Sequence, residues 1–157
     1  MTVIDNLILT INPGIFLILG GLISNILPLK IAQKFNIALP LLLLLSLWNT
    51  EQGNHFSVLF LGYNLELFRV DTFSYIFGII FLIAIAVANL YSIGATTGKI
   101  EPSASMIYAG SATAAVFAGD LITLFIFFEI AAISSVFLIW ARGTKRAFSA
   151  GFRYLIV

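Results

Sequence analysis

A single carboxyl group within an apolar stretch is the group in this sequence best suited to chemistry. The stretch runs from Leu121 to Trp140 and contains one charged residue, Glu129. As a helix at about 1.5 Å per residue it would span roughly 30 Å, the hydrocarbon thickness of a bilayer, with Glu129 about 12 Å from its start. An acidic residue near the centre of a spanning helix costs about 2.5–3.5 kcal/mol on insertion. We therefore expect this carboxyl group to have a function.

The surroundings of Glu129 favour a role in proton transfer. Its neighbours on the same helical face, among them Phe125, Ile126, Ala132 and Ile133, are all apolar. No Lys or Arg lies within the five stretches that we predict to be complete spans. A carboxyl group that is charged or neutral according to a nearby cation suits a proton relay. The alternative is a protonated Glu129 that forms a structural hydrogen bond between helices.

Hydroxyl side chains in the same part of the sequence could hold water for proton transfer. The candidates are Ser134, Ser135 and Thr113, with Ser111 and Thr123 nearby in the sequence. Hydroxyls in membrane helices also bond to the carbonyls of the preceding turn or join neighbouring helices. We favour this structural interpretation and keep the water relay as the alternative.

Composition restricts the class of protein. Hydrophobic residues make up 61% of the 157 residues and charged residues 10%, which predicts an integral membrane protein. The net charge of +1 gives no basic field for nucleic acid. The chain has no cysteine and one histidine, so we expect no disulfide, no metal site and no bound cofactor. The first residues lack a basic region, so we expect no cleaved signal peptide.

Hydropathy along the chain predicts an all-α membrane fold formed by residues 1–157 as a single domain. We expect five complete transmembrane helices, a truncated sixth, and a small β-hairpin between the second and third. The predicted spans are Gly14–Leu29, Phe35–Trp48, Thr72–Ile93, Ala104–Gly119 and Leu121–Trp140, and the truncated helix is Ala147–Val157. The hairpin is predicted from the runs Ser57–Leu61 and Leu65–Val70, with a turn at residues 62–64.

Small residues and charges indicate how these spans are arranged. Gly110, Ala114 and Ala118 recur every four residues, which predicts a helix face that packs closely against another helix. Asp120 directly precedes an apolar run and is predicted to cap its helix. With the N-terminus outside, seven of the eight basic residues lie on the inner side, the exception being Arg69. We therefore expect a multi-pass protein of the cell inner (plasma) membrane with its N-terminus outside.

One long motif is similar to a known family. The segment GDLITLFIFFEIAAISSVFLIWAR resembles the core of the antiporter-like membrane subunits, in which an acidic residue follows an aromatic pair and precedes hydroxyl residues. Here these are Phe127-Phe128-Glu129 and Ser134-Ser135, with Phe128 where the family usually has Trp. The segments LELFRVDTFSYIF and ARGTKRAFSAGFRYLIV extend the resemblance. The chain is most similar to D-type subunits of multisubunit (Mrp-type) Na+/H+ antiporters.

The resemblance implies a function and its alternatives. Family members have about fourteen helices, and their glutamate pairs with a lysine on the seventh, so this chain resembles the N-terminal third of the family. We expect a membrane subunit, or a fragment of one, of a monovalent cation/proton antiporter, with Glu129 in the proton path and with other membrane subunits and the lipid bilayer as partners. It would not itself be an enzyme. The alternatives are a proton-pumping subunit of NADH:quinone oxidoreductase or a membrane-bound hydrogenase, and an inactive remnant or membrane scaffold.

Overall fold

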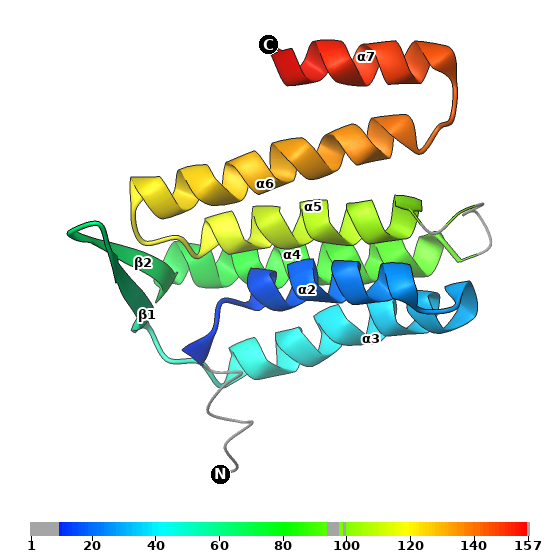
Figure 1. Cartoon of the computed structure of the whole chain (residues 1–157). Helices are drawn as coiled ribbons and strands as arrows, with labels where there is room; N and C mark the ends of the chain where they lie inside the picture. Colours follow the sequence, from blue (N-terminus) through cyan, green and yellow to red (C-terminus); the bar gives the residue numbers. More distant parts are fainter. Residues whose placement is uncertain (1–9, 94–97, 99, 157) are drawn as a thin grey trace.

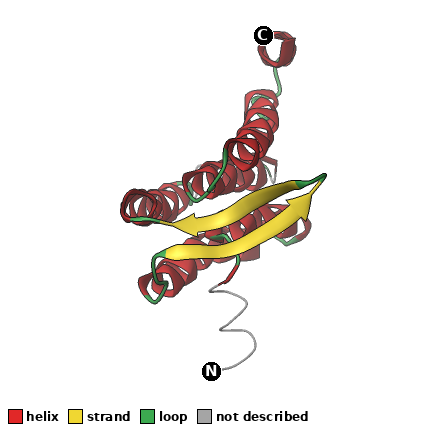
Figure 2. Ribbon diagram, turned by 90° about the vertical axis from the view of Figure 1, so that its left-hand side faces the viewer, coloured by secondary structure: helices red, strands yellow, loops and turns green. Residues whose placement is uncertain are grey.

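The fold is a bundle of helices with a β-hairpin at one end (Figures 1 and 2). A computed structural model describes residues 10–93, 98 and 100–156. Among these residues it contains α2 (Pro13–Ile26), α3 (Leu29–Trp48), β1 (Gly53–Phe60), β2 (Tyr63–Val70), α4 (Thr72–Tyr91), α5 (Ile100–Val116), α6 (Leu121–Trp140) and α7 (Lys145–Ile156). The predicted all-α architecture with a hairpin between the second and third predicted spans is therefore confirmed.

Successive helices run in opposite directions, so the bundle has two distinct ends (Figure 1). We call one the hairpin end; it comprises residues 10–12, 49–71 and 117–120. The other, the basic end, comprises residues 27–28, 92–93, 98 and 141–144 among those described. Because the helices alternate in direction, the connections fall at these two ends and the spans lie between them.

Short polar side chains fix where two of the long helices begin. The Asp71 carboxylate accepts hydrogen bonds from the N–H groups of Phe73 and Ser74, and the Ser74 hydroxyl accepts one from the Asp71 N–H. This reciprocal arrangement satisfies amide groups that the first turn of α4 leaves without partners. The predicted cap at Asp120 is confirmed, since its carboxylate accepts from the N–H groups of Ile122 and Thr123.

The hairpin has a tight turn that matches its twist. The strands β1 and β2 are antiparallel, with Phe60 paired to Tyr63 across the turn. Leu61 and Gly62 occupy the turn with φ values of 49° and 84°. Two residues of positive φ are typical of the hairpin turns that match the right-handed twist of strands. The predicted hairpin is confirmed, but both strands are longer than predicted and the turn is at residues 61–62.

Close contact between α2 and α5 holds the centre of the bundle. A methyl group added at Gly110 would lie 2.9 Å from the carbonyl oxygen of Gly14 and 2.8 Å from the nitrogen of Ile18. Glycines on both helices therefore let their backbones meet, as small residues do in membrane helices. The small-residue face predicted for Gly110, Ala114 and Ala118 is confirmed as a helix contact at the first two residues, whereas Ala118 lies beyond the end of α5. Beside it lies an apolar core that includes Leu17, Leu43, Leu82, Met106 and Phe117.

Several predicted helix boundaries were wrong. The first helix ends at Ile26 instead of Leu29, because Leu27 is extended and Pro28 precedes the next helix. The second begins at Leu29 instead of Phe35 and includes Pro40 in its interior. The fourth runs from Ile100 to Val116 instead of from Ala104 to Gly119. The fifth, Leu121–Trp140, was predicted with the bounds that the structure shows.

The number of membrane-spanning helices that the structure supports is lower than predicted. By length and apolar composition three described helices could cross a membrane, namely α3, α4 and α6. The helix α2 has 14 residues and α5 has 17, fewer than the roughly 20 that a span usually requires. The structure thus supports a membrane protein with three candidate spans, and the predicted five complete spans are not supported by length and composition.

The helix α7 folds back onto α6 through an aromatic cluster (Figure 1). Trp140 packs against Phe148 and Phe152, with ring centroids 5.2 and 5.4 Å apart, and its indole N–H donates to the carbonyl of Phe148 at 3.2 Å. Gly151 is buried directly beneath the indole. The predicted helix Ala147–Val157 is confirmed as α7, which begins two residues earlier; Val157 lies outside the described residues.

Replacing Gly110 tests the close contact of α2 and α5. Gly110→Val should lower the free energy of unfolding by about 1–3 kcal/mol, because the new side chain overlaps the backbone of α2. Gly98→Val is the matched control, since an added carbon at Gly98 meets no atom within 4 Å. Thermal or denaturant unfolding in detergent measures both variants. Equal stabilities of the two variants would contradict the packing described.

Replacing Asn12 tests a buried bridge at the hairpin end. The Asn12 amide donates to the carbonyl oxygens of Leu67 at 2.8 Å and Ala114 at 3.0 Å. Asn12→Ala should lower the free energy of unfolding by about 1–3 kcal/mol, because the carbonyl groups of Leu67 and Ala114 each lose a hydrogen bond and the buried side chain is removed. Asn54→Ala, on the exposed side of the hairpin, is the control and should change stability little. An equally large loss of stability in Asn54→Ala would contradict a specific role for Asn12.

Candidate functional site

Glu129 lies in the middle of α6 and points away from α5. The face of α6 that packs on α5 carries buried Thr123, Phe127, Ala131 and Ser134. At 100° per residue Glu129 is about 200° around the helix from Phe127, so it is on the opposite side. Its side chain is exposed in the described structure. The sequence placed Glu129 at the correct depth along the helix, but it gave no direction for the side chain.

The side of α6 that carries Glu129 is the side on which α7 packs (Figures 1 and 2). Val136 is seven residues from Glu129 and therefore on nearly the same face. Val136 is only 1% exposed, whereas Glu129, Phe125 and Ile133 on this side are exposed. The helix α7 thus covers this face near the basic end and leaves it open around the carboxyl group.

No described residue neutralises Glu129. The two ion pairs among the described residues both involve Arg69, with Glu66 at 3.6 Å and Asp71 at 3.8 Å, at the hairpin end. Glu129 forms neither an ion pair nor a hydrogen bond within the described part of the chain. A carboxylate in the middle of a membrane helix lacks solvation by water, because hydrocarbon does not solvate charge, and the described residues supply no counter-charge.

The hydroxyl groups considered for a water relay bond to their own helices. Ser134 donates to the carbonyl of Ala131 at 2.9 Å and Ser135 to that of Ala132 at 2.7 Å. Thr113 on α5 donates to the carbonyl of Ala109 at 2.8 Å. Ser134 is buried on the face of α6 that packs on α5, and Thr113 is buried inside the bundle, whereas Glu129 is exposed on the opposite side of α6. The described structure therefore does not bring these hydroxyls next to the carboxyl group.

A polar junction at the hairpin end positions α6, and the sequence analysis missed it. The Asp120 carboxylate accepts a hydrogen bond from the Glu66 N–H at 2.7 Å in addition to those from its own helix. The Gly119 N–H donates to the carbonyl of Glu66 at 2.8 Å, and the Arg69 N–H donates to that of Phe117 at 2.9 Å. The connection between α5 and α6 is thus held by the backbone of β2.

A second group that sequence reasoning missed is the amide of Asn36 in α3. Its side chain is 1% exposed, and neither its oxygen nor its nitrogen has a hydrogen-bond partner among the described residues. An unpaired amide inside an apolar bundle is unfavourable, since burial without a partner costs roughly 1–3 kcal/mol. A polar residue within an apolar run was the available signal, and the sequence analysis did not use it.

The comparisons with known proteins add no relative. Comparisons of the chain with family models, with curated proteins and with solved structures find no match. The candidate site therefore stands on the residues and geometry described above, together with the motif around Glu129.

The pH dependence of stability should reveal the Asp120 junction. Burial alone would raise the pKa of Asp120, but hydrogen bonds from the Thr123 hydroxyl and N–H and from the Glu66 and Ile122 N–H groups hold the pKa below its usual 3.8. The folded protein then releases this proton more readily than the unfolded chain. The junction's contribution is complete above about pH 4 and is lost as the pH falls through the lower folded pKa.

Asp120→Asn should therefore weaken the decline of stability below about pH 4, and it should cost roughly 1 kcal/mol or less at neutral pH, because Asn also caps helices. Glu51→Gln, in an exposed loop, is the control and should leave the acid decline as it is in the unaltered protein. Unfolding measured across the acid range checks this. An unchanged pH profile in Asp120→Asn would contradict the junction.

Proposed function

We propose that this chain is a membrane subunit, or part of one, of a multisubunit monovalent cation/proton antiporter. Glu129 would be the protonatable residue of the proton path. The observation that carries the proposal is the position of this carboxyl group, which lies in the middle of an apolar helix, without a counter-charge among the described residues and open to a partner. The motif around Glu129 resembles the antiporter-like membrane subunits, and this resemblance is the reason for proposing an antiporter.

The open face around Glu129 supports a role in a larger assembly. Exposure of this carboxyl to lipid would be unfavourable, with roughly 2.5–3.5 kcal/mol as the scale of the insertion penalty. A partner helix with a basic residue would remove that penalty and would also control whether Glu129 holds a proton. Binding and release of a proton under such control is what coupled transport requires. Glu129 would thus act together with a cation supplied by another segment or subunit.

We further propose that α2 and α5 cross the membrane together with the three candidate spans. Both helices connect the hairpin end to the basic end, as α3, α4 and α6 do. Their small and polar residues fit this position because neighbouring helices cover them, as the buried Ser111 and Thr113 of α5 illustrate. This gives five spans, with α7 folded back onto α6.

The charges support an orientation for these spans. Lys30, Lys34, Arg142, Lys145 and Arg146 lie near the basic end, and Arg69 is the one basic residue described at the hairpin end. Basic residues favour the cytoplasmic side. In the proposed topology the hairpin end and the N-terminus face outward, and the membrane is the cell inner (plasma) membrane.

Replacing Glu129 tests the proton path. Glu129→Gln keeps the size of the side chain and removes its ability to ionise. In the complex reconstituted into vesicles, we expect cation-driven proton exchange to fall to the level of vesicles without the complex, as followed with a pH-sensitive dye. Glu101→Gln is the matched control, since Glu101 is an exposed carboxylate in the first turn of α5. It should retain exchange.

The outcomes separate the alternatives. Unchanged exchange in Glu129→Gln would remove the assignment of this residue. Flavin, iron–sulfur clusters or quinone reductase activity in the purified complex would instead favour a subunit of a redox-driven proton pump. Failure of the chain to assemble with any membrane subunit would favour an inactive remnant or a scaffold.

A further inference from the structure

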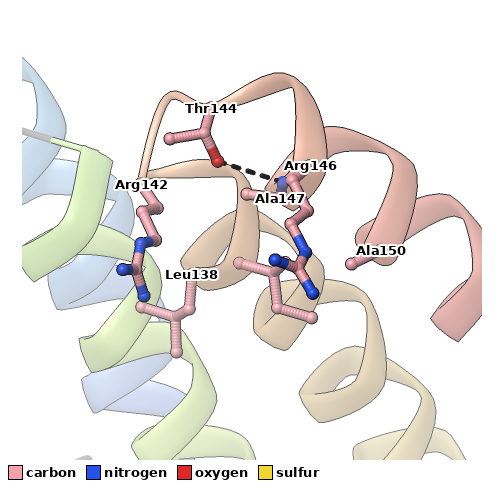
Figure 3. Close-up of a pocket in the computed structure, with 7 residues that line it drawn as sticks. Leu138, Arg142, Thr144, Arg146, Ala147 and Ala150 are labelled. Carbon is pink, nitrogen blue, oxygen red and sulfur yellow. Dashed lines mark hydrogen bonds between the residues drawn. The ribbon is translucent and has the colours of Figure 1, made fainter.

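A pocket lies between the end of α6 and the start of α7 (Figure 3). Its volume is about 760 Å³, which is within the range of small-molecule sites. The residues that form it include Leu138, Ile139, Arg142, Arg146, Ala147 and Ala150. The pocket is thus polar at its rim, where two arginines lie, and apolar along the two helices.

The connection between α6 and α7 brings the two arginines to one place. Gly143 has a φ of 68°, which allows the chain to reverse directly after Arg142. The Thr144 hydroxyl accepts a hydrogen bond from the Ala147 N–H at 3.1 Å and so begins α7. Figure 3 shows the side chains of Arg142 and Arg146 extending from this connection in the same direction, beside Leu138. The two guanidinium groups therefore share the pocket.

Neither arginine has an acidic partner in the part of the chain that the structure describes. Both side chains are exposed, and neither forms an ion pair or a hydrogen bond through its guanidinium group among the described residues. Exposed Lys30 and Lys145 add positive charge near the basic end, and Glu101 is the acidic residue described there. Two unpaired guanidinium groups over an apolar wall would bind an anion that also has apolar surface.

We propose that this pocket binds an anionic phospholipid. The phosphodiester of the headgroup would be held by Arg142 and Arg146, since guanidinium groups bind phosphate through paired N–H donors. An acyl chain would lie along Leu138, Ile139 and Ala150. Basic pockets at membrane-helix ends bind anionic headgroups for this reason. Trp140, at the same end of α6, is a typical residue of the membrane–water interface, the level at which lipid phosphates lie.

The apolar wall distinguishes a lipid from a soluble phosphate. Inorganic phosphate or glycerol phosphate would contact the arginines alone, and it would leave the surface of Leu138 and Ala150 uncovered. A lipid satisfies both parts of the pocket, with its headgroup on the cations and its chain on the apolar residues. The proposal does not depend on the role of Glu129, which lies nearer the middle of α6 and which the test below does not measure.

Quenching by brominated lipids of a tryptophan placed in the pocket wall tests the proposal. The chain has two tryptophans, Trp48 at the other end of the bundle and Trp140 on the Lys145 side of the connection, so Trp48→Phe and Trp140→Phe together with Ala150→Trp leave one reporter in the pocket. The full chain is reconstituted in phosphatidylcholine vesicles that contain a minor fraction of brominated phosphatidylglycerol or of brominated phosphatidylcholine. We expect stronger quenching by the anionic lipid, and a preference that falls roughly fivefold for each arginine replaced by Gln.

Three controls make the result decisive. Lys145→Gln removes a charge from the same connection but not from this pocket, and it should keep the preference. The double variant Arg142→Lys, Arg146→Lys keeps both positive charges and should keep most of the preference for the anionic lipid. Soluble glycerol phosphate should not compete. Equal quenching by the two lipids, an equal loss in Lys145→Gln, or displacement by glycerol phosphate would each overturn the lipid site. Circular dichroism verifies that each variant is folded.

Discussion

The bundle depends on hydrogen bonds from a protein side chain to buried backbone groups at the hairpin end. Asn12 is fully buried there, and its amide reaches the carbonyls of Leu67 in β2 and Ala114 in α5 while its oxygen accepts from the Gly14 N–H. A helix leaves its last carbonyl groups without partners within the helix, and burial makes an unpaired carbonyl costly. One side chain thus joins the start of α2, the end of α5 and the hairpin. Because α2 and α5 meet through glycines, their separation is fixed both by this bridge and by the backbone contact at Gly110.

The same end also determines where α6 lies. The backbone of β2 bonds to both sides of the connection between α5 and α6, through Gly119 and Phe117, and Asp120 closes the connection by accepting from Glu66. The start of α6 is therefore attached to the sheet as well as to α5. With one end fixed and the Thr123–Ser134 face packed on α5, the rotation of α6 is set, and Glu129 must face outward. The direction of the carboxyl group therefore follows from the packing of the opposite face of α6 and from the connection that precedes this helix.

These dependencies explain which features the sequence could predict. The bounds of α6 and the start of α4 were predictable because Asp120 and Asp71 precede long apolar runs, and local capping decides such boundaries. The start of α3 was missed because no capping side chain precedes Leu29 and because Lys30 and Lys34 interrupt the apolar run, although long basic side chains at the end of a membrane helix can extend to the interface. The start of α5 was missed because Pro102 suggested a loop, whereas proline is tolerated in the first turn of a helix.

For the candidate site, too, the sequence predicted one property of Glu129 and could not predict another. The depth of Glu129 was predictable because it requires only the rise per residue. Its direction was not, since α6 is apolar on every side and an all-round apolar helix carries no periodic signal for the face that it buries. Ser134 lies on the α5 side of α6, because small polar residues suit close helix contacts, and that places it away from Glu129. The inside of the bundle is thus complete without the carboxyl group, which faces outward on the α7 side of α6.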